Sequence, residues 1–322
     1  MSKENSDTKL LSLVVSAYNE EEVLENFYNT SKKVLDSLSW DYEIIFVNDG
    51  SIDKTYEIIN NLATSDKKVK AIHFSRNFGH EAAMIAGIDY AKGDAIVCMD
   101  ADLQHPPATL PQIVTYFESD YDIVNMVRIS NKSAGFIKNI TSEAFYYIIN
   151  VISDAKLIRN ASDFMCISGR AAKVLRKNYR EKIRFLRGYV QNIGFKKINM
   201  EYMANERAAG KSKYSIKKLF KFSMNTIMCF SDFPLRLGIY AGFFAILMGL
   251  IMSIYTIISW AKVGTPNGYA TIIVLICFMF AVLFFLVGII GEYISILFAE
   301  LKDRPIYIVE DMKNIEDLNL NN

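Results

Sequence analysis

The sequence predicts an α/β protein built on a doubly wound, mostly parallel sheet, followed by amphipathic interfacial helices and two transmembrane helices. Three observations support this fold class. Apolar segments of strand length alternate with segments of helix length over residues 10–127. Polar clusters follow successive strands. Two long uncharged apolar segments lie in the C-terminal third of the chain.

The composition excludes several classes of protein. The 322 residues suffice for one large soluble domain and a further region. The formal net charge is +1, so charge gives no reason to expect a nucleic-acid partner. The four cysteines form no C-x-x-C pair, which argues against a zinc–thiolate site or a disulfide framework and fits a reducing cytosol. The polar N-terminal segment has no signal-peptide pattern.

Strands and helices are predicted in alternation. Continuous runs of Val, Ile and Leu indicate strands that are buried on both faces of a parallel sheet. Such strands are expected at residues 10–17, 42–47, 69–74, 94–99 and 122–127. The intervening helices are expected at residues 20–37, 54–63, 80–91 and 107–119. Gly50 permits a tight turn after the second strand.

The stretch with the clearest chemistry is Asp100-Ala101-Asp102, at the end of the fourth strand. In an extended backbone residues i and i+2 point to the same side, so both carboxylates can face one ligand. Paired carboxylates suit a hard divalent cation such as Mg²⁺ or Mn²⁺, which in turn binds phosphates. An isolated D-x-D is also explained by an ordinary polar turn. The rest of the chain has to decide between the two interpretations.

The surroundings of this stretch favour a phosphate-containing ligand. Ligands of a doubly wound sheet bind outside the carboxyl ends of the strands. Tyr18, Asp49 and the D-x-D all follow predicted strand ends. Neither a P-loop nor a G-x-G-x-x-G segment follows the first strand. Nucleotide phosphates would therefore be neutralised by a metal and by basic side chains.

Four segments resemble, in order, the motifs of family 2 glycosyltransferases of the GT-A fold. More narrowly, they are similar to polyprenyl-phosphate sugar synthases related to dolichol-phosphate mannose synthase and bactoprenol glucosyltransferase. The segments read VSAYNEE at 15–21, NDGSIDKT at 48–55, SRNFG at 75–79 and MDADLQHPP at 99–107.

The resemblance implies roles for single residues. The nucleotide would be bound by Tyr18, Glu20, Asp49, Asp100 and Gln104. The Mg²⁺ or Mn²⁺ ion would be held by Asp100 and Asp102. Catalytic roles fall to Asp102, Asp163 and Arg207, with Asp163 serving the acceptor.

The chain departs from the family pattern at two places. Asn48 stands where the family often has Asp, so a charge is lost there although hydrogen bonding remains. Met165-Cys166 follows Asp163-Phe164 where the family commonly has Arg-Leu. The local contacts of Asp163 are expected to differ accordingly.

Two basic segments are candidates for phosphate contacts. Residues 128–153 mix cations with apolar and aromatic side chains, which fits either a half-buried helix or an interfacial helix. In the interfacial interpretation Arg128 and Lys138 meet the lipid phosphate. Residues 207–214 resemble the family's mobile loop over the donor phosphates, which assigns Arg207, Lys211 and Lys213 to phosphate binding. The basic cluster at 184–188 is left without a functional assignment.

The C-terminal third predicts a membrane hairpin. Residues 237–260 and 269–291 carry no charge, and each segment exceeds the roughly 20 residues that a helix needs to cross a bilayer. Basic residues flank the pair, and only Lys262 lies between them. The positive-inside rule therefore predicts a multi-pass protein of the cell membrane, with the catalytic domain and both termini in the cytoplasm. The Gly238-x-x-x-Gly242 spacing allows a homo-oligomer through these helices.

The expected organisation has three parts. A cytosolic GT-A catalytic domain occupies residues 1–230 and includes interfacial helices near 133–152 and 215–230. A membrane domain occupies 231–300, and a cytosolic tail occupies 301–322.

The resemblance implies an inverting glycosyltransferase. It would move a hexose from a nucleotide-diphosphate sugar, with UDP-glucose the first choice, to polyprenyl (undecaprenyl) phosphate in the bilayer, for cell-envelope glycosylation. UDP-N-acetylglucosamine and GDP-mannose are alternative donors. A polysaccharide synthase would need a Q-x-x-R-W segment and more spans, and the sequence has neither. A non-catalytic protein that only binds nucleotide sugars would not need the full set of motifs.

Overall fold

The computed structural model describes residues 8–129, 149–151, 157–182, 184–205, 227, 231, 233–263 and 268–315. Its elements are β1 (Leu10–Ala17), α1 (Leu24–Leu35), β2 (Asp41–Asn48), α2 (Thr55–Ser65), β3 (Val69–Phe74), α3 (His80–Tyr90), β4 (Ala95–Asp100), η1 (Pro107–Thr109), α4 (Leu110–Glu118), β5 (Ile123–Arg128), β6 (Ala161–Ser168), α6 (Gly169–Asn178), α7 (Leu186–Asn192), β7 (Lys197–Tyr202), α9 (Phe233–Val263), α10 (Tyr269–Leu301) and β8 (Val309–Lys313).

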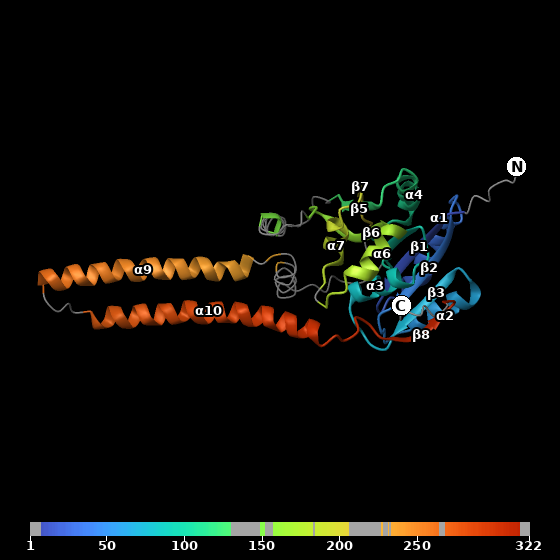
Figure 1. Cartoon of the computed structure of the whole chain (residues 1–322). Helices are drawn as coiled ribbons and strands as arrows, with labels where there is room; N and C mark the ends of the chain where they lie inside the picture. Colours follow the sequence, from blue (N-terminus) through green and yellow to red (C-terminus); the bar gives the residue numbers. More distant parts are fainter. Residues whose placement is uncertain are drawn as a thin grey trace.

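One eight-stranded sheet organises the globular part of the molecule, in the order β7-β5-β6-β4-β1-β2-β3-β8 (Figure 1). β1 pairs in parallel with both β2 and β4, and β3 continues the parallel set beyond β2. β6 is antiparallel to both of its neighbours, β4 and β5, and β8 is antiparallel to β3. The predicted doubly wound, mostly parallel sheet is therefore confirmed, with β6 and β8 as the two strands of opposite direction.

The predicted helices and strands of the first 128 residues are all present, with small shifts at their ends. The largest shift is at α1, which was expected from residue 20 and begins at Leu24. The amides that precede it bond to the loop after β2 instead. Glu20 N–H donates to Thr55 Oγ1 and Glu21 N–H donates to Asp53 Oδ2. These amides precede the helix and have no intrahelical acceptor, so the two side chains satisfy them and tie the start of α1 to the segment after β2.

Two hydrophobic cores lie on the two faces of the sheet. Phe27 of α1, Ile59 of α2 and Ile113 of α4 belong to one core. The other core joins α3, α6 and α7 to the opposite face. Burying each large apolar side chain contributes roughly 1.5–3 kcal/mol. α3 lies directly on β1, because a Cβ at Gly87 would come within 2.1 Å of Val14 Cγ1.

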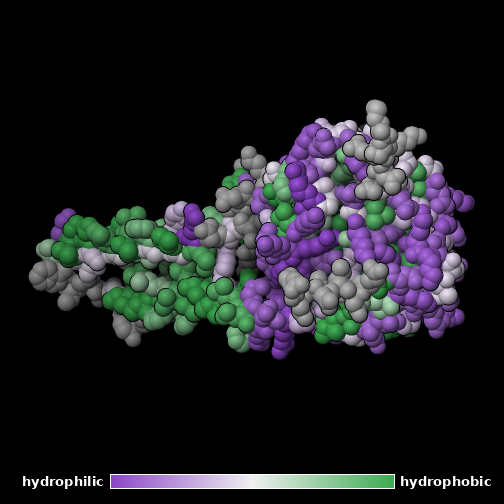
Figure 2. All heavy atoms as spheres, turned by 45° about the vertical axis from the view of Figure 1, so that its right-hand side comes forward, coloured by the Kyte–Doolittle hydropathy of each residue, from purple (hydrophilic) through white to green (hydrophobic). Residues whose placement is uncertain are grey.

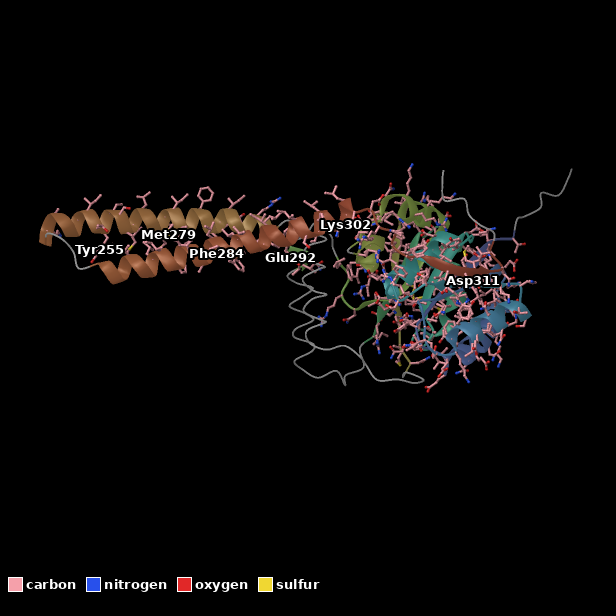
Figure 3. All side chains as sticks on the ribbon, turned by 90° about the horizontal axis from the view of Figure 1, so that it is seen from below. Tyr255, Met279, Phe284, Glu292, Lys302 and Asp311 are labelled. Atoms are coloured by element: carbon pink, nitrogen blue, oxygen red, sulfur yellow. The ribbon has the colours of Figure 1, made fainter. Side chains whose placement is uncertain are left out.

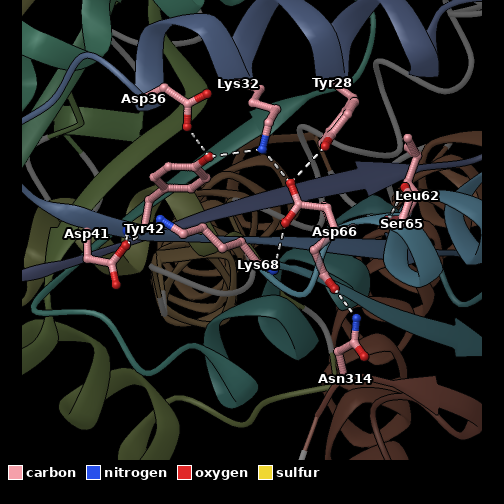
Figure 4. Close-up of polar contacts among 11 residues, drawn as sticks. Tyr28, Lys32, Asp36, Asp41, Tyr42, Leu62, Ser65, Asp66, Lys68 and Asn314 are labelled. Atoms are coloured by element: carbon pink, nitrogen blue, oxygen red, sulfur yellow. Dashed lines mark hydrogen bonds and ion pairs between the residues drawn. The ribbon is translucent and has the colours of Figure 1, made fainter.

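A polar network lies at the end of the sheet where β2 and β3 begin (Figure 4). Lys32 of α1 forms an ion pair with Asp66 at 2.5 Å, and Tyr28 donates a hydrogen bond to the same carboxylate. Tyr42 donates to Asp36. The hydrogen bond to Asp66 raises the pKa of Lys32, so this lysine stays charged. The network joins α1 to the sheet at the edge opposite the polar strand ends.

The chain returns to the sheet after the last helix. β8 pairs with β3 and completes that edge. Tyr307 stacks on Phe74 and donates to Asp89 at 2.7 Å. Asn314 donates to the carbonyls of Ala63 and Val69. The sequence predicts a cytosolic tail at residues 301–322 with no strand in it, whereas Val309–Lys313 of this segment forms β8.

α9 and α10 project from the globular part as a long hairpin (Figure 1). Apolar side chains cover the hairpin, whereas polar side chains dominate the visible face of the globular part (Figure 2). Figure 3 shows Tyr255 and Phe284 on the projecting helices, and Asp311 within the globular part. Two segments, Phe233–Ile258 and Phe278–Leu301, are long and apolar enough to cross a membrane.

α10 continues beyond the predicted end of its span at residue 291 and reaches Leu301. This extension contacts the globular part. Lys182 N–H donates to Glu300 Oε1 at 2.6 Å. Tyr293 OH donates to the carbonyl of Ser231, which lies just before α9, at 2.8 Å and so joins the two helices of the hairpin near its base.

Candidate functional site

The predicted site residues gather where β1, β2 and β4 end. The register pairs Ala17 with Asn48 and Ser16 with Asp100. Tyr18, Asp49 and Asp102 follow these strand ends directly. The expectation that one edge of the sheet carries these polar groups is therefore confirmed.

Asp163 comes to the same edge from the opposite direction. β6 runs antiparallel to β4, and Cys98 pairs with Met165. Continuing this register by two residues sets Asp163 opposite Asp100. Their side chains are 45% and 35% exposed. No local pattern in the sequence indicates that β6 lies between β4 and β5, so this juxtaposition emerges only from the fold.

The D-x-D turn has a defined backbone. Gln104 N–H donates to Asp102 Oδ1 at 3.0 Å, and Leu103 adopts a positive φ of 60°. The oxygens of Asp100 and Asp102 are the ligand type that Mg²⁺ and Mn²⁺ prefer. Among the described residues there is no group of three or more His, Cys, Asp or Glu that could hold a metal ion. The donor set therefore fits a cation that also takes ligands from a bound phosphate and from water.

His105, which has no role predicted from the sequence, packs against the D-x-D turn and holds its backbone. Its ring is buried, stacks on Phe164 at 4.9 Å and meets the edge of Tyr202. Asp100 N–H donates to His105 Nδ1 at 3.1 Å, which leaves the proton of a neutral ring on Nε2. Burial lowers the pKa of His105, so the ring stays neutral and holds the backbone of Asp100.

His80 is a site residue that the sequence analysis missed. It begins α3, and its Nδ1 lies 2.8 Å from Ser16 Oγ while its Nε2 lies 3.6 Å from Asp100 Oδ1. Burial by itself would lower the pKa of His80, but nearby carboxylates, Asp100 foremost, raise that pKa above its ordinary value. Its position directly after the polar turn at 76–79 was the available signal.

Asp49 holds the turn that precedes α3. Its buried carboxylate accepts hydrogen bonds from the amides of Phe78 and Gly79. Burial raises the pKa of Asp49, and these two amides counteract the rise. Gly50 has a φ of +63°, and a Cβ there would lie 2.3 Å from the carbonyl carbon of Arg76. Direct contact between Asp49 and a nucleotide stays a prediction.

The first two polar loops brace each other. Asn19 N–H donates to Ser51 Oγ at 2.9 Å, and Ile52 N–H donates to Asn19 Oδ1 at 2.9 Å. Asn48 Oδ1 accepts from Ser51 N–H at 3.0 Å. The side chain of Tyr18 remains 42% exposed beside these loops. An exposed aromatic ring on a braced loop is suited to contact a planar ligand.

The predicted basic residues lie mostly outside the described ranges. Lys138, Arg207, Lys211 and Lys213 all fall there. Arg128 is described: it is exposed at the end of β5, where its amide donates to the carbonyl of Asn160. Asn205 Nδ2 donates to the carbonyl of Leu103 at 3.2 Å, so the chain contacts the D-x-D turn just before residue 207.

Two family models match the chain, one over the globular part and one over the hairpin. The glycosyl transferase family 2 model matches residues 12–180, and the GtrB C-terminal hairpin model matches residues 233–297. The glycosyltransferase YkcC of Bacillus subtilis is 39% identical over 96% of both chains. The bactoprenol glucosyl transferase of Shigella phage SfV is 37% identical over 94% of this chain and 99% of its own.

Among solved structures, glucosyl-3-phosphoglycerate synthase from Mycobacterium tuberculosis, in complex with Mn²⁺, UDP-glucose and phosphoglyceric acid, covers 68% of this chain and 78% of its own. The TM-score is 0.47 at 16% identity. The family model spans the strands that carry the carboxylates, and the relatives align along almost the whole chain. The chain therefore belongs to glycosyl transferase family 2.

Proposed function

We propose that this protein transfers a sugar from a nucleotide-diphosphate donor to the phosphate of a polyprenyl lipid. Bactoprenol glucosyl transferases support this reaction, because they are similar to the chain across both the catalytic sheet and the hairpin. Undecaprenyl phosphate is the proposed acceptor. UDP-glucose is the first donor to test, with UDP-N-acetylglucosamine and GDP-mannose as alternatives.

The observation that carries the proposal is the meeting of Asp100 and Asp163 at one edge of the sheet. Asp100 belongs to the D-x-D turn, which we assign to the donor. Asp163 is the third residue of a separate strand, β6, which we assign to the acceptor. A transfer reaction needs its two substrates held side by side in a fixed orientation. Two carboxylate-bearing elements that converge from opposite directions suit that requirement.

We assign the donor side to the ends of β1, β2 and β4. Asp100 and Asp102 would hold Mg²⁺ or Mn²⁺, which supplies positive charge against the donor diphosphate. The remaining nucleotide contacts are assigned to Tyr18, Glu20, Asp49 and Gln104. Arg207, Lys211 and Lys213 would neutralise the diphosphate from the segment that follows Asn205. Arg128 and Lys138 would meet the lipid phosphate.

The proposed chemistry is a single displacement. A phosphate oxygen of the lipid attacks the anomeric carbon from the face opposite the diphosphate. The new C–O bond forms as the bond to the diphosphate breaks, which inverts the anomeric centre. A phosphate is already anionic near neutral pH and needs little help from a general base. We therefore assign Asp163 to orienting the acceptor side rather than to removing a proton.

The proposal predicts that Asp102→Asn lowers the formation of lipid-linked sugar about 100-fold or more, because positioned charge at a leaving group typically contributes roughly 10²–10³ in rate. Membranes containing the protein are incubated with undecaprenyl phosphate and a panel of radiolabelled nucleotide sugars. The lipid product is then extracted and counted. Asp94→Asn is the matched control, because Asp94 precedes the other end of β4 and accepts from Leu10 N–H. This control should keep near-normal activity.

Several outcomes would overturn the proposal. Normal product formation by a folded, membrane-bound Asp102→Asn variant would remove Asp102 from the mechanism. A product that lengthens with time would indicate a polysaccharide synthase. Donor binding without turnover, for every donor of the panel, would indicate a non-catalytic binding protein.

A further inference from the structure

Arg187, in the first turn of α7, lies beside Asp163. Its Nη1 donates to the carbonyl of Ala161 at 2.6 Å and lies 3.7 Å from Asp163 Oδ1. The guanidinium is also 4.9 Å from the ring centroid of Phe185. The side chain of Arg187 is only 17% exposed, whereas that of Asp163 is 45% exposed. A fixed, mostly buried cation therefore faces a carboxylate that is open to solvent.

The charges around Asp163 show what this cation counters. The β4–β6 pairing runs as far as Cys98 and Met165 and directs Asp100 and Asp163 to the same edge of the sheet. The Asp163 carboxylate also adds to the rise in the pKa of Glu81. A bound phosphate would add further negative charge. Repulsion of this kind turns an exposed carboxylate away from the site unless a cation holds it. Arg187 is placed to do so, because its bond to Ala161 fixes it at the start of the same strand.

The segment that carries Arg187 is itself anchored at two points. Leu186 N–H donates to Glu81 Oε1 of α3 at 3.3 Å. Lys182 N–H donates to Glu300 Oε1, in the last turn of α10, at 2.6 Å. The position of Arg187 is thus set by the helix that begins at the site and by the end of the second apolar helix. An anchored guanidinium keeps its geometry better than a free one.

We propose that Arg187 is a positioning residue that holds the Asp163 carboxylate in place for the acceptor. It acts through Asp163 and makes no contact with the donor. The inference rests on the proposed function, which makes Asp163 an acceptor-side group.

The test is a double-mutant cycle on the full-length protein in membranes, with Arg187→Met, Asp163→Asn and the double variant. Arg187→Met should lower kcat for lipid-linked sugar about 10- to 100-fold and leave the donor KM within about twofold. In the Asp163→Asn background the same substitution should cost less than about threefold, because residues that act as a unit are not additive. The cycle is repeated with Arg187→Gln, which removes the charge but keeps an N–H donor.

Arg170→Met is the matched control. Arg170 also forms an ion pair with an aspartate, Asp122, and lies over an aromatic ring, that of Phe195, but at the other end of β6. Its kcat should stay within about twofold of wild type. Thermal unfolding of every variant identifies losses that come from folding alone.

The proposal is overturned if the losses in the double variant multiply, or if Asp163→Asn keeps full activity. It is also overturned if Arg187→Met raises the donor KM about tenfold, or if Arg187→Gln, folded as stably as wild type, keeps full kcat. A wild-type protein that makes no lipid-linked sugar from any donor would instead refute the proposed function. The two failures are therefore distinguishable.

Discussion

Glu81 follows His80 in the first turn of α3, and its pKa is raised to about 7. Burial is the largest cause, and Asp163 adds to it, while the Leu186 amide, Arg184 and His80 act in the other direction. The ordinary pKa of this group is 4.5, so between the two values the folded protein binds more protons at Glu81 than the unfolded chain does. Folding stability from this group is therefore complete at low pH and is lost as the pH rises towards 7.

Glu81→Gln should remove this pH dependence. Glutamine keeps an oxygen for the Leu186 amide and carries no charge at any pH. At pH 8 we expect the variant to be more stable than wild type by roughly 3 kcal/mol, because the pKa of Glu81 is raised from 4.5 to about 7 and each unit corresponds to about 1.4 kcal/mol. At pH 4.5 the difference should vanish. Urea unfolding at a series of pH values measures it, and an equal difference at both ends of the series would contradict the assignment.

At the scale of elements, β8 forms one edge of the sheet, where it pairs with β3. Tyr307 connects this C-terminal segment to α3, because its hydroxyl donates to Asp89, which also forms an ion pair with Arg180 at 2.8 Å. The Asp89 carboxylate is almost fully buried. A buried acceptor that loses a partner keeps its desolvation cost. Loss of the Tyr307–Asp89 hydrogen bond should therefore lower the free energy of unfolding more than loss of a comparable hydrogen bond at the surface.

Tyr307→Phe should lower the free energy of unfolding of the catalytic domain by about 1–3 kcal/mol. Tyr56→Phe is the matched control, since Tyr56 also donates to an aspartate, Asp311 of β8, but at an exposed position. That substitution should cost less than about 0.5 kcal/mol. Chemical denaturation followed by tryptophan fluorescence compares the two variants. If both variants lose the same free energy of unfolding, the buried hydrogen bond to Asp89 contributes no more to stability than the exposed one to Asp311.

Local pattern sufficed for some elements and failed for others. β1 to β4 and their polar ends could be predicted, because each strand is a continuous apolar run followed by turn residues. β8 could not, because VEDMK has no apolar run and lies at the edge of the sheet. The antiparallel insertion of β6 depends on pairings between distant segments. Long-range pairings leave no periodic signal in the sequence.

In the site, too, some residue positions follow from local sequence and others depend on the fold. The positions of Asp100 and Asp102 at a strand end follow from local sequence alone. The positions of His80 and Arg187 do not, because each contacts a carboxylate of another element through the fold. Arg187 stood in a basic cluster that looked no different from a solvated surface.

At the scale of the whole molecule, the β3–β8 pairing constrains the membrane topology. β3 precedes both long helices and β8 follows them, yet the two strands share one sheet. If α9 and α10 enter a bilayer, the chain must cross it an even number of times. We infer a hairpin, with both of its ends on the side of the catalytic domain. The positive-inside rule predicts that this side is the cytoplasm.

Cysteine labelling tests this topology. Cys98 and Cys166 are buried, so Cys229 and Cys277 are replaced first and single sites are then introduced. Thr265→Cys, between the helices, should react with a membrane-impermeant maleimide on intact cells. Asp303→Cys, at a fully exposed position after α10, should react only after the cells are permeabilised. The reverse pattern would place the catalytic domain outside the cell.

The pairing of β8 with β3 also orders events during synthesis. β3 is made long before β8, and until β8 arrives its outer edge has unpaired backbone donors and acceptors that invite contacts with other chains. The partner strand is translated only after both long helices. If the hairpin enters a bilayer, the chain must return to its starting side before the catalytic sheet can be completed. A ribosome-bound chain that stops within α10 would carry the D-x-D turn on a sheet that is still open at β3.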